Sequence, residues 1–264
     1  MTGPLPIVLV PGLICSARLY AEQISSLWAC GPIIIADHRR DDSVAAIAAR
    51  ILAMAPPRFA LAGLSMGGYI AFAIAREAPE RVTRLALLDT SARPDTPEQT
   101  ERRHSMIALA DSGRFAEVPD LLFPVFVHRD RHGDEALRTI VRTMAEETGP
   151  QAFVRQQHAI MTRPDCRPLL KSIRCPTLVL VGDGDALTPP MLSEEIAAGV
   201  AGARRCACPI VDTSPRWSGR RRSTGHSSNG LRCDCAANCW NIASPSRDDS
   251  PAQCYKRACP RSLI

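Results

Sequence analysis

Short, continuous apolar runs recur along the first 183 residues, and segments with helical periodicity separate them. Apolar runs of this length without polar alternation are typical of parallel strands that are covered on both faces. Alternation of strand and helix at this spacing predicts an α/β fold with a mostly parallel, doubly wound sheet. The predicted strands are Pro6–Val10, Pro32–Ala36, Phe59–Ala62, Leu85–Leu88 and Thr177–Val181, and the helices between the first four are Ala17–Trp28, Ser43–Met54 and Gly68–Glu77.

The pattern changes after Asp89, where the chain carries helical periodicity and no clear strand over residues of about 92–165. The helical patterns cover Gln99–Ala110, Asp134–Glu147 and Gln151–Met161. These helices either pack on a face of the sheet or form a lid over the carboxyl ends of the strands. A single crossover helix would suffice to connect two parallel strands, so the extra helices favour the lid.

A candidate nucleophile lies between one predicted strand and the helix that follows it. The segment Gly63-Leu64-Ser65-Met66-Gly67 has the form G-x-S-x-G. In a nucleophile elbow the backbone turns so sharply that the residues two before and two after the serine have almost no room for a side chain. The strand before and the helix after this segment are the context that the motif requires. The sequence therefore predicts that Ser65 projects from the end of the sheet.

Residues from 5 to about 204 resemble the α/β-hydrolase fold family, in its lid-bearing branch of esterases, lactonases and haloperoxidases. Three segments carry the resemblance. Pro11-Gly12-Leu13 follows the first strand where that family often has His-Gly-x, the segment from Gly63 to Gly67 matches the elbow, and the segment from Gly182 to Pro189 matches G-x-x-D-x-x-T/V-P. The resemblance implies a helical lid inserted after the strand that ends near Asp89.

The resemblance also implies roles for individual residues. Ser65 is expected to be the nucleophile and Asp185 the acid of a Ser-Asp-His triad, with Asp183 as the rival acid. The backbone N–H groups of Leu13 and Met66 are expected to form the oxyanion hole. A serine rather than an aspartate at the elbow indicates acyl transfer. The acyl group of a small ester, lactone or thioester would pass to the serine and then to water. Neither a cofactor nor a metal is expected, and the same triad would support perhydrolysis if peroxide replaced water.

The family's histidine is missing from its expected place. In the family it follows one more strand, in a segment of the type G-H-x-x-x-x-E-x-P, and this chain has no such segment. A triad serine needs an imidazole to accept its proton. Five histidines precede Asp185 and so break the family's order, while the sixth lies in an arginine- and serine-rich segment; they are His38, His104, His128, His132, His158 and His226.

Composition changes near residue 204. Residues 204–264 carry 11 Lys and Arg against 4 Asp and Glu, and they hold seven of the 11 cysteines. Residues 1–203 carry 21 basic and 23 acidic residues, so the basic net charge of +5 does not indicate nucleic-acid binding by the main domain. We therefore predict a hydrolase domain over residues 1–204 and an irregular tail over residues 205–264.

Back-translation offers an explanation for this tail. Arginine outnumbers lysine 30 to 2, which suggests a GC-rich gene. Reading back-translated codons for Ala207–Leu231 one base earlier permits a peptide that begins Val-Pro-Asp-Cys-Gly-His and continues as an amphipathic helix. In that frame the codon that spans Asp212 and Thr213 encodes only His or Tyr. We interpret residues after about Arg204 as out of frame, and we expect a severely impaired enzyme if the chain is made as written.

The alternative is a genuine appended module on a non-catalytic binding protein. Cys206, Cys208, Cys233, Cys235 and Cys239 could then act as zinc ligands, although no pair has the C-x₂-C spacing. The first residues lack a charged region, and the apolar run Pro6–Val10 is too short for a signal peptide or a membrane span. We therefore expect a cytoplasmic protein that acts on a small-molecule ester and binds neither membrane nor nucleic acid.

Overall fold

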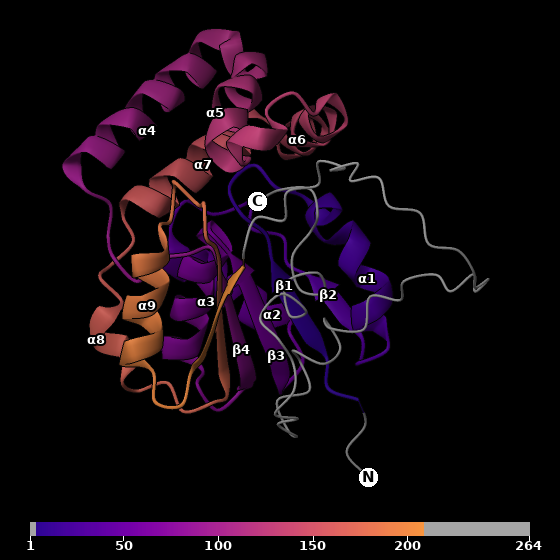
Figure 1. Ribbon diagram of the computed structural model, residues 1–264, viewed down its shortest axis with the longest axis vertical. Coiled ribbons are helices and arrows are strands. Elements are labelled where there is room, and N and C mark those ends of the chain that lie inside the picture. Colours follow the sequence, from indigo (N-terminus) through magenta and orange to yellow (C-terminus); the bar gives the residue numbers. More distant parts are fainter. Residues whose placement is uncertain (1–3, 209–264) are drawn as a thin grey trace, which may run out of the picture.

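Six parallel strands form one sheet at the centre of the molecule, in the order β2-β1-β3-β4-β5-β6 (Figure 1). The computed structural model describes residues 4–208. The strands are β1 (Ile7–Val10), β2 (Ile33–Ile35), β3 (Phe59–Leu64), β4 (Val82–Leu88), β5 (Thr177–Gly182) and β6 (Arg204–Cys208). The prediction of a mostly parallel α/β sheet is confirmed, and each of the five predicted strands is present with shifted ends.

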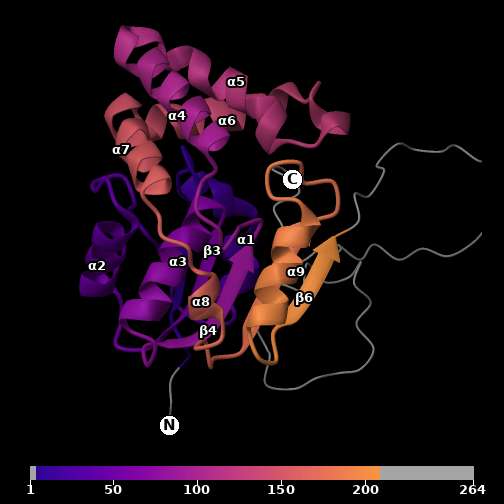
Figure 2. The ribbon, with the colours of Figure 1, turned by 90° about the vertical axis from the view of Figure 1, so that its left-hand side faces the viewer.

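Helices cover the sheet on both faces, as a doubly wound fold requires (Figures 1 and 2). On one face, Ile47 and Ile70 pack with strand residues such as Leu61. On the other face, Leu27 packs against Leu9. These strands form a central domain together with the helices η1 (Ala17–Tyr20), α1 (Ala21–Trp28), α2 (Val44–Met54), α3 (Met66–Glu77), α8 (Arg167–Leu170) and α9 (Pro190–Gly199). No helix within residues 4–208 is long and apolar enough to cross a membrane.

The sheet extends beyond the predicted boundary at residue 204. β6 pairs with β5 from Leu178 opposite Arg204 to Gly182 opposite Cys208. The expectation of irregular chain from Arg205 onward is therefore wrong for residues 205–208. Pairing at a sheet edge depends on main-chain hydrogen bonds, so a strand forms here although its sequence, Arg-Arg-Cys-Ala-Cys, has no apolar run. The rest of the predicted tail lies outside the described residues.

A helical insertion connects β4 to β5 and lies beyond the carboxyl ends of the strands (Figure 1). We use this name for residues 97–161. Three of its long helices agree with the predicted ones, but α5 was missed because its sequence is apolar almost throughout and contains Pro124, which hides the helical period. The long helices are α4 (Pro97–Leu109), α5 (Val118–Phe126), α6 (Glu135–Thr148) and α7 (Pro150–Met161), and the short turns are η2 (Ala110–Arg114), η3 (Phe115–Glu117) and η4 (Arg129–Arg131).

A buried ion pair joins the two ends of this insertion. Asp95, which precedes α4, accepts hydrogen bonds from Arg163, which follows α7, and from Arg103 of α4. The side chains of Asp95 and Arg163 are only 1% and 5% exposed. The guanidinium of Arg163 also lies 4.2 Å from the ring centroid of Tyr69 in α3. The two ends of the insertion are therefore joined to each other, and Arg163 also links them to α3.

We expect Asp95→Asn to lower the free energy of unfolding by about 3–5 kcal/mol, because it leaves a buried guanidinium without its counter-charge. Denaturant unfolding measures this. Asp165→Asn is the matched control, since Asp165 forms an exposed pair with Arg167 and its loss should lower the free energy of unfolding far less. Equal costs for the two substitutions would contradict the assignment.

Candidate active site

Ser65 occupies a strained turn between β3 and α3. Its φ of 51° and ψ of −111° are rare for a residue other than glycine. Neighbouring groups hold the turn: the Ser65 N–H donates to Leu88 O at 2.9 Å, and the Thr90 hydroxyl donates to Ser65 O at 2.8 Å. A serine at a helix N-cap usually accepts a hydrogen bond from the first turn, but Ser65 makes no such bond. Its hydroxyl is therefore left available to the cavity that Ser65 lines.

The glycines of the elbow lie where no side chain fits. A Cβ on Gly63 would lie 2.2 Å from Gly67 O, and one on Gly67 would lie 2.0 Å from Val10 O. This is the steric crowding that the sequence motif predicts. Gly68 has the same restriction, because a Cβ there would lie 2.3 Å from the Thr90 hydroxyl oxygen. The motif did not single out Gly68, since its crowding comes from Thr90, in the segment after β4, and not from the turn itself.

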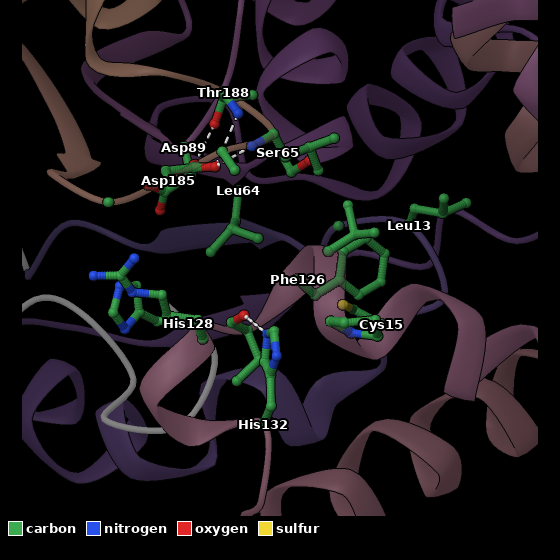
Figure 3. A pocket seen from close by; sticks show the side chains of 18 of the residues that line it. Leu13, Cys15, Leu64, Ser65, Asp89, Phe126, His128, His132, Asp185 and Thr188 are labelled. Carbon is green, nitrogen blue, oxygen red and sulfur yellow. Dashed lines mark hydrogen bonds between the residues drawn. The ribbon is translucent and has the colours of Figure 1, made fainter.

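A cavity of about 610 Å³ opens in front of Ser65 (Figure 3). Ser65, Asp89, Asp183 and Asp185 contribute from the carboxyl ends of the strands. Apolar side chains from both the central domain and the helical insertion form much of the remaining wall, among them Leu13, Leu19, Leu64, Phe126 and Leu187. The structure thus brings the predicted nucleophile and both candidate acids to one cavity.

One predicted oxyanion-hole residue, Met66, belongs to the elbow, and the other, Leu13, lies in the loop after β1. Met66 is the first residue of α3, where N–H groups lack intrahelical acceptors and the helix dipole is positive. Leu13 lies in the loop after β1 and lines the cavity. His38 helps to hold that loop, since its Nε2 atom lies 2.9 Å from Gly12 O. Burial lowers the pKa of His38, so this histidine favours the neutral form.

The helical insertion also holds the loop after β1, through α6 and α7. The N–H of Ile14, whose φ is 50°, donates to the Oε1 atom of Gln156 in α7 at 3.0 Å. The Ser16 hydroxyl donates to Glu147 of α6 at 2.5 Å. Sequence reasoning missed Gln156 and Glu147, because their contacts span more than 130 residues and follow no local motif. They tie the position of the loop to the position of the insertion.

Asp185 is held by its own loop after β5. Its Oδ1 accepts hydrogen bonds from the N–H groups of Leu187 and Thr188, both at 2.8 Å, and its Oδ2 accepts one from the Thr188 hydroxyl at 2.5 Å. The Thr188 of the G-x-x-D-x-x-T-P pattern thus orients the aspartate three residues before it. Asp183 is exposed and also lines the cavity.

Asp89 is a cavity residue that sequence reasoning did not assign to the site. It follows β4, is 6% exposed and has a φ of 43°. Its Oδ1 accepts a hydrogen bond from the Gly182 N–H at 3.0 Å. Burial, together with the nearby charge of Asp185, raises the pKa of Asp89 to about 8. The sequence held one indication that Asp89 belongs to the site. Asp89 is a polar residue directly after β4, and β4 lies next to β3, the strand that leads to Ser65.

The histidines of the described chain do not supply the family's arrangement. His128 and His132 line the cavity, but they belong to the helical insertion, which precedes Asp185 (Figure 3). His104 and His158 are exposed on α4 and α7. His226 lies outside the described residues, as do Cys233, Cys235 and Cys239 of the alternative zinc module. Cys206 is a buried free thiol in β6.

The chain is similar to a known protein family and to individual hydrolases. The profile of the family described as serine aminopeptidase, S33, matches residues 36–208. A protein of Azorhizobium caulinodans, provisionally named a carbamate hydrolase, is 30% identical over 216 residues, which are 75% of this chain and 80% of the relative. The pimeloyl-[acyl-carrier protein] methyl ester esterase of Neisseria meningitidis serogroup B is 29% identical over 62% of this chain and 66% of that protein.

Solved structures share the architecture. A thermophilic esterase from Thermogutta terrifontis superposes with a TM-score of 0.71 at 28% identity, over 78% of this chain and 81% of the esterase. The enol-lactonase from Burkholderia xenovorans LB400 gives the same TM-score at 24% identity, over 78% of this chain and 83% of the lactonase. The second likeness shows the fold alone. The predicted α/β-hydrolase fold is thereby confirmed.

We expect Gly67→Ala to destabilise the protein by about 4 kcal/mol or more, because the new methyl group would overlap Val10 O and force β1 away from the elbow. Thermal or denaturant unfolding measures the loss. Gly133→Ala is the control, since a Cβ there meets no atom within 4 Å, and its effect should stay within about 0.5 kcal/mol. A well-tolerated Gly67→Ala would show that the elbow is not as tight as described.

Proposed function

The chain belongs to the serine aminopeptidase S33 family, and we propose that it is a serine hydrolase that cleaves a small ester, lactone or thioester through an acyl-enzyme. The observation that carries the proposal is the elbow itself. Ser65 stands in a strained turn at the N-terminus of α3, with its hydroxyl free of any capping bond, and shares a cavity with Asp185. Backbone strain of this kind concentrates at functional sites, where it fixes a reacting group.

In the proposed mechanism, the Ser65 oxygen attacks the carbonyl carbon of the substrate and its proton passes to a base. The Leu13 and Met66 N–H groups stabilise the negative charge that develops on the carbonyl oxygen. Collapse of the tetrahedral intermediate expels the alcohol or thiol, which takes up the proton, and leaves an acyl group on Ser65. Water then attacks the acyl-enzyme by the same route and releases the acid. Asp185 serves to orient the base.

Cavity size and lining support a small substrate with an apolar part. A volume of about 610 Å³ lies within the range of small-molecule sites, and residues such as Leu19, Leu64 and Phe126 offer apolar contact. We propose that the helical insertion acts as a lid, because it lines this cavity and is bonded to the loop that carries Leu13. The names of the relatives suggest methyl esters and carbamates as first substrates to test.

The base is the one part that residues 4–208 do not provide in the family's order. We propose that a frameshift near Arg204–Arg205 replaced the segment that carried the histidine. β6 runs from Arg204 to Cys208, so the change would fall at the strand after which the family places its histidine. The chain as written is then a severely impaired hydrolase, because loss of the triad base costs on the order of 10⁶-fold in kcat in a serine protease.

Two experiments test this proposal. Sequencing the DNA across codons 200–210 should reveal a missing or extra base. The frame-restored chain should then hydrolyse p-nitrophenyl acetate at least about 10³-fold faster than the chain as written, since it regains the base.

Ser65→Ala in the frame-restored chain should remove this gain, whereas Ser112→Ala, on an exposed turn of the insertion, should leave it intact. Rapid hydrolysis by the chain as written that depends on Ser65 would contradict the impairment. Rapid hydrolysis that survives Ser65→Ala would contradict the nucleophile.

A further inference from the structure

We propose that Asp89 and Asp185 form a carboxyl pair that shares one proton, in which Asp89 is the donor and positions Asp185. Asp89 is a positioning residue in this proposal and not a group that reacts with substrate. The pair itself depends only on the described geometry. Its relevance to catalysis rests on the proposed function, in which Asp185 orients the base.

The sheet brings the two carboxyl groups together. β4 and β5 are neighbouring parallel strands, Leu88 pairs with Leu180, and the Asp89 N–H donates to Leu180 O at 2.9 Å. Neighbouring strands lie about 4.8 Å apart, so residues that follow both strands can touch. The Gly182 N–H fixes Asp89 Oδ1 on the β5 side, and Figure 3 shows the Asp89 and Asp185 side chains next to each other.

A count of donors places the proton on Asp89. Both oxygens of Asp185 already accept hydrogen bonds, three in all, from Leu187 and Thr188. Asp89 has one donor, on Oδ1, and its buried Oδ2 has no hydrogen-bond partner among the described residues. A buried carboxylate oxygen without a donor is costly. Protonation removes this cost, because the Oδ2–H then donates to the Asp185 carboxylate.

The electrostatic surroundings agree with this arrangement. The pKa of Asp89 is raised first by burial and then by both the charge and the hydrogen bonding of Asp185, and the Gly182 N–H opposes these effects only in part. The other ionisable groups that line the cavity are the Cys15 thiol, Asp183, His128, Arg129 and His132, and none of them is a cause of the shift. The pair therefore carries one negative charge near neutral pH and two above about pH 8.

The pair has a consequence for Asp185. A fourth hydrogen bond, from Asp89, would fix the Asp185 carboxylate against the floor of the cavity while leaving its charge in place. Above about pH 8 the bond is replaced by repulsion between two carboxylates. Above this pH, Asp185 should therefore no longer hold the base in its orientation.

Infrared spectroscopy of the full chain tests the proton directly. At about pH 6, where exposed carboxyl groups are ionised, we expect the C=O stretching band of one protonated carboxylic acid. The band should disappear around pH 8 and should be absent at about pH 6 in Asp89→Asn. Asp183→Asn is the matched control and should keep the band with an unchanged midpoint. Asp185→Asn should keep the band and move its midpoint to lower pH, because the repelling charge is gone.

Unfolding as a function of pH gives a second measurement. The folded pKa of Asp89 lies above its unfolded value of about 3.9, so the folded state holds the extra proton between these values. The contribution of Asp89 to stability therefore falls as pH rises from about 4 to about 8, and Asp89→Asn should remove that fall. Asparagine suits the positive φ and can both accept from Gly182 and donate to Asp185.

The outcomes separate the pair from the proposed function. Absence of the band in the wild type, or its survival in Asp89→Asn, would overturn the pair whatever the activity. A band that behaves as expected, with a frame-restored chain that lacks Ser65-dependent hydrolysis, would uphold the pair and overturn the proposed function. In an active frame-restored chain, the loss of kcat above about pH 8 should be smaller in Asp89→Asn than in the wild type, and an unchanged loss would overturn the positioning role.

Discussion

The close packing of backbone against backbone at the elbow is the constraint on which the site depends. Gly67 must pass Val10 O, and Gly63 must pass Gly67 O, at distances that exclude any Cβ. This packing lets α3 begin directly at the end of β3 and forces Ser65 into its positive φ. The Ser65 backbone is held by hydrogen bonds, but its hydroxyl makes no capping bond to α3, and Ser65 lines the cavity.

The remaining parts of the site are arranged around that turn by tertiary contacts. Strand pairing places Asp89 beside the elbow and beside the loop of Asp185, while the helical insertion holds the loop after β1 through Gln156 and Glu147. The insertion is itself fastened at its two ends by Asp95 and Arg163. A change in the insertion can therefore reach the oxyanion-hole loop without touching Ser65.

Local patterns predicted most of the fold, because buried parallel strands and amphipathic helices leave clear periods in the sequence. They also predicted the crowding at Gly63 and Gly67, since the motif reflects a local turn. The missed features are tertiary: α5 is apolar without a period, β6 depends on pairing with β5, and Asp89 and Gln156 matter through distant partners. The roles of Ser65, Asp185, Leu13 and Met66 remain predictions.

Reaction of the frame-restored chain with a fluorophosphonate, followed by peptide mass spectrometry, shows directly whether Ser65 is the nucleophile. We expect one phosphonyl group, on Ser65, and no labelling of the Ser65→Ala variant. The serine that the elbow presents is the only one for which we infer a nucleophilic role. A label on another residue, or no reaction while the protein remains folded, would contradict the claim that the elbow makes Ser65 a nucleophile.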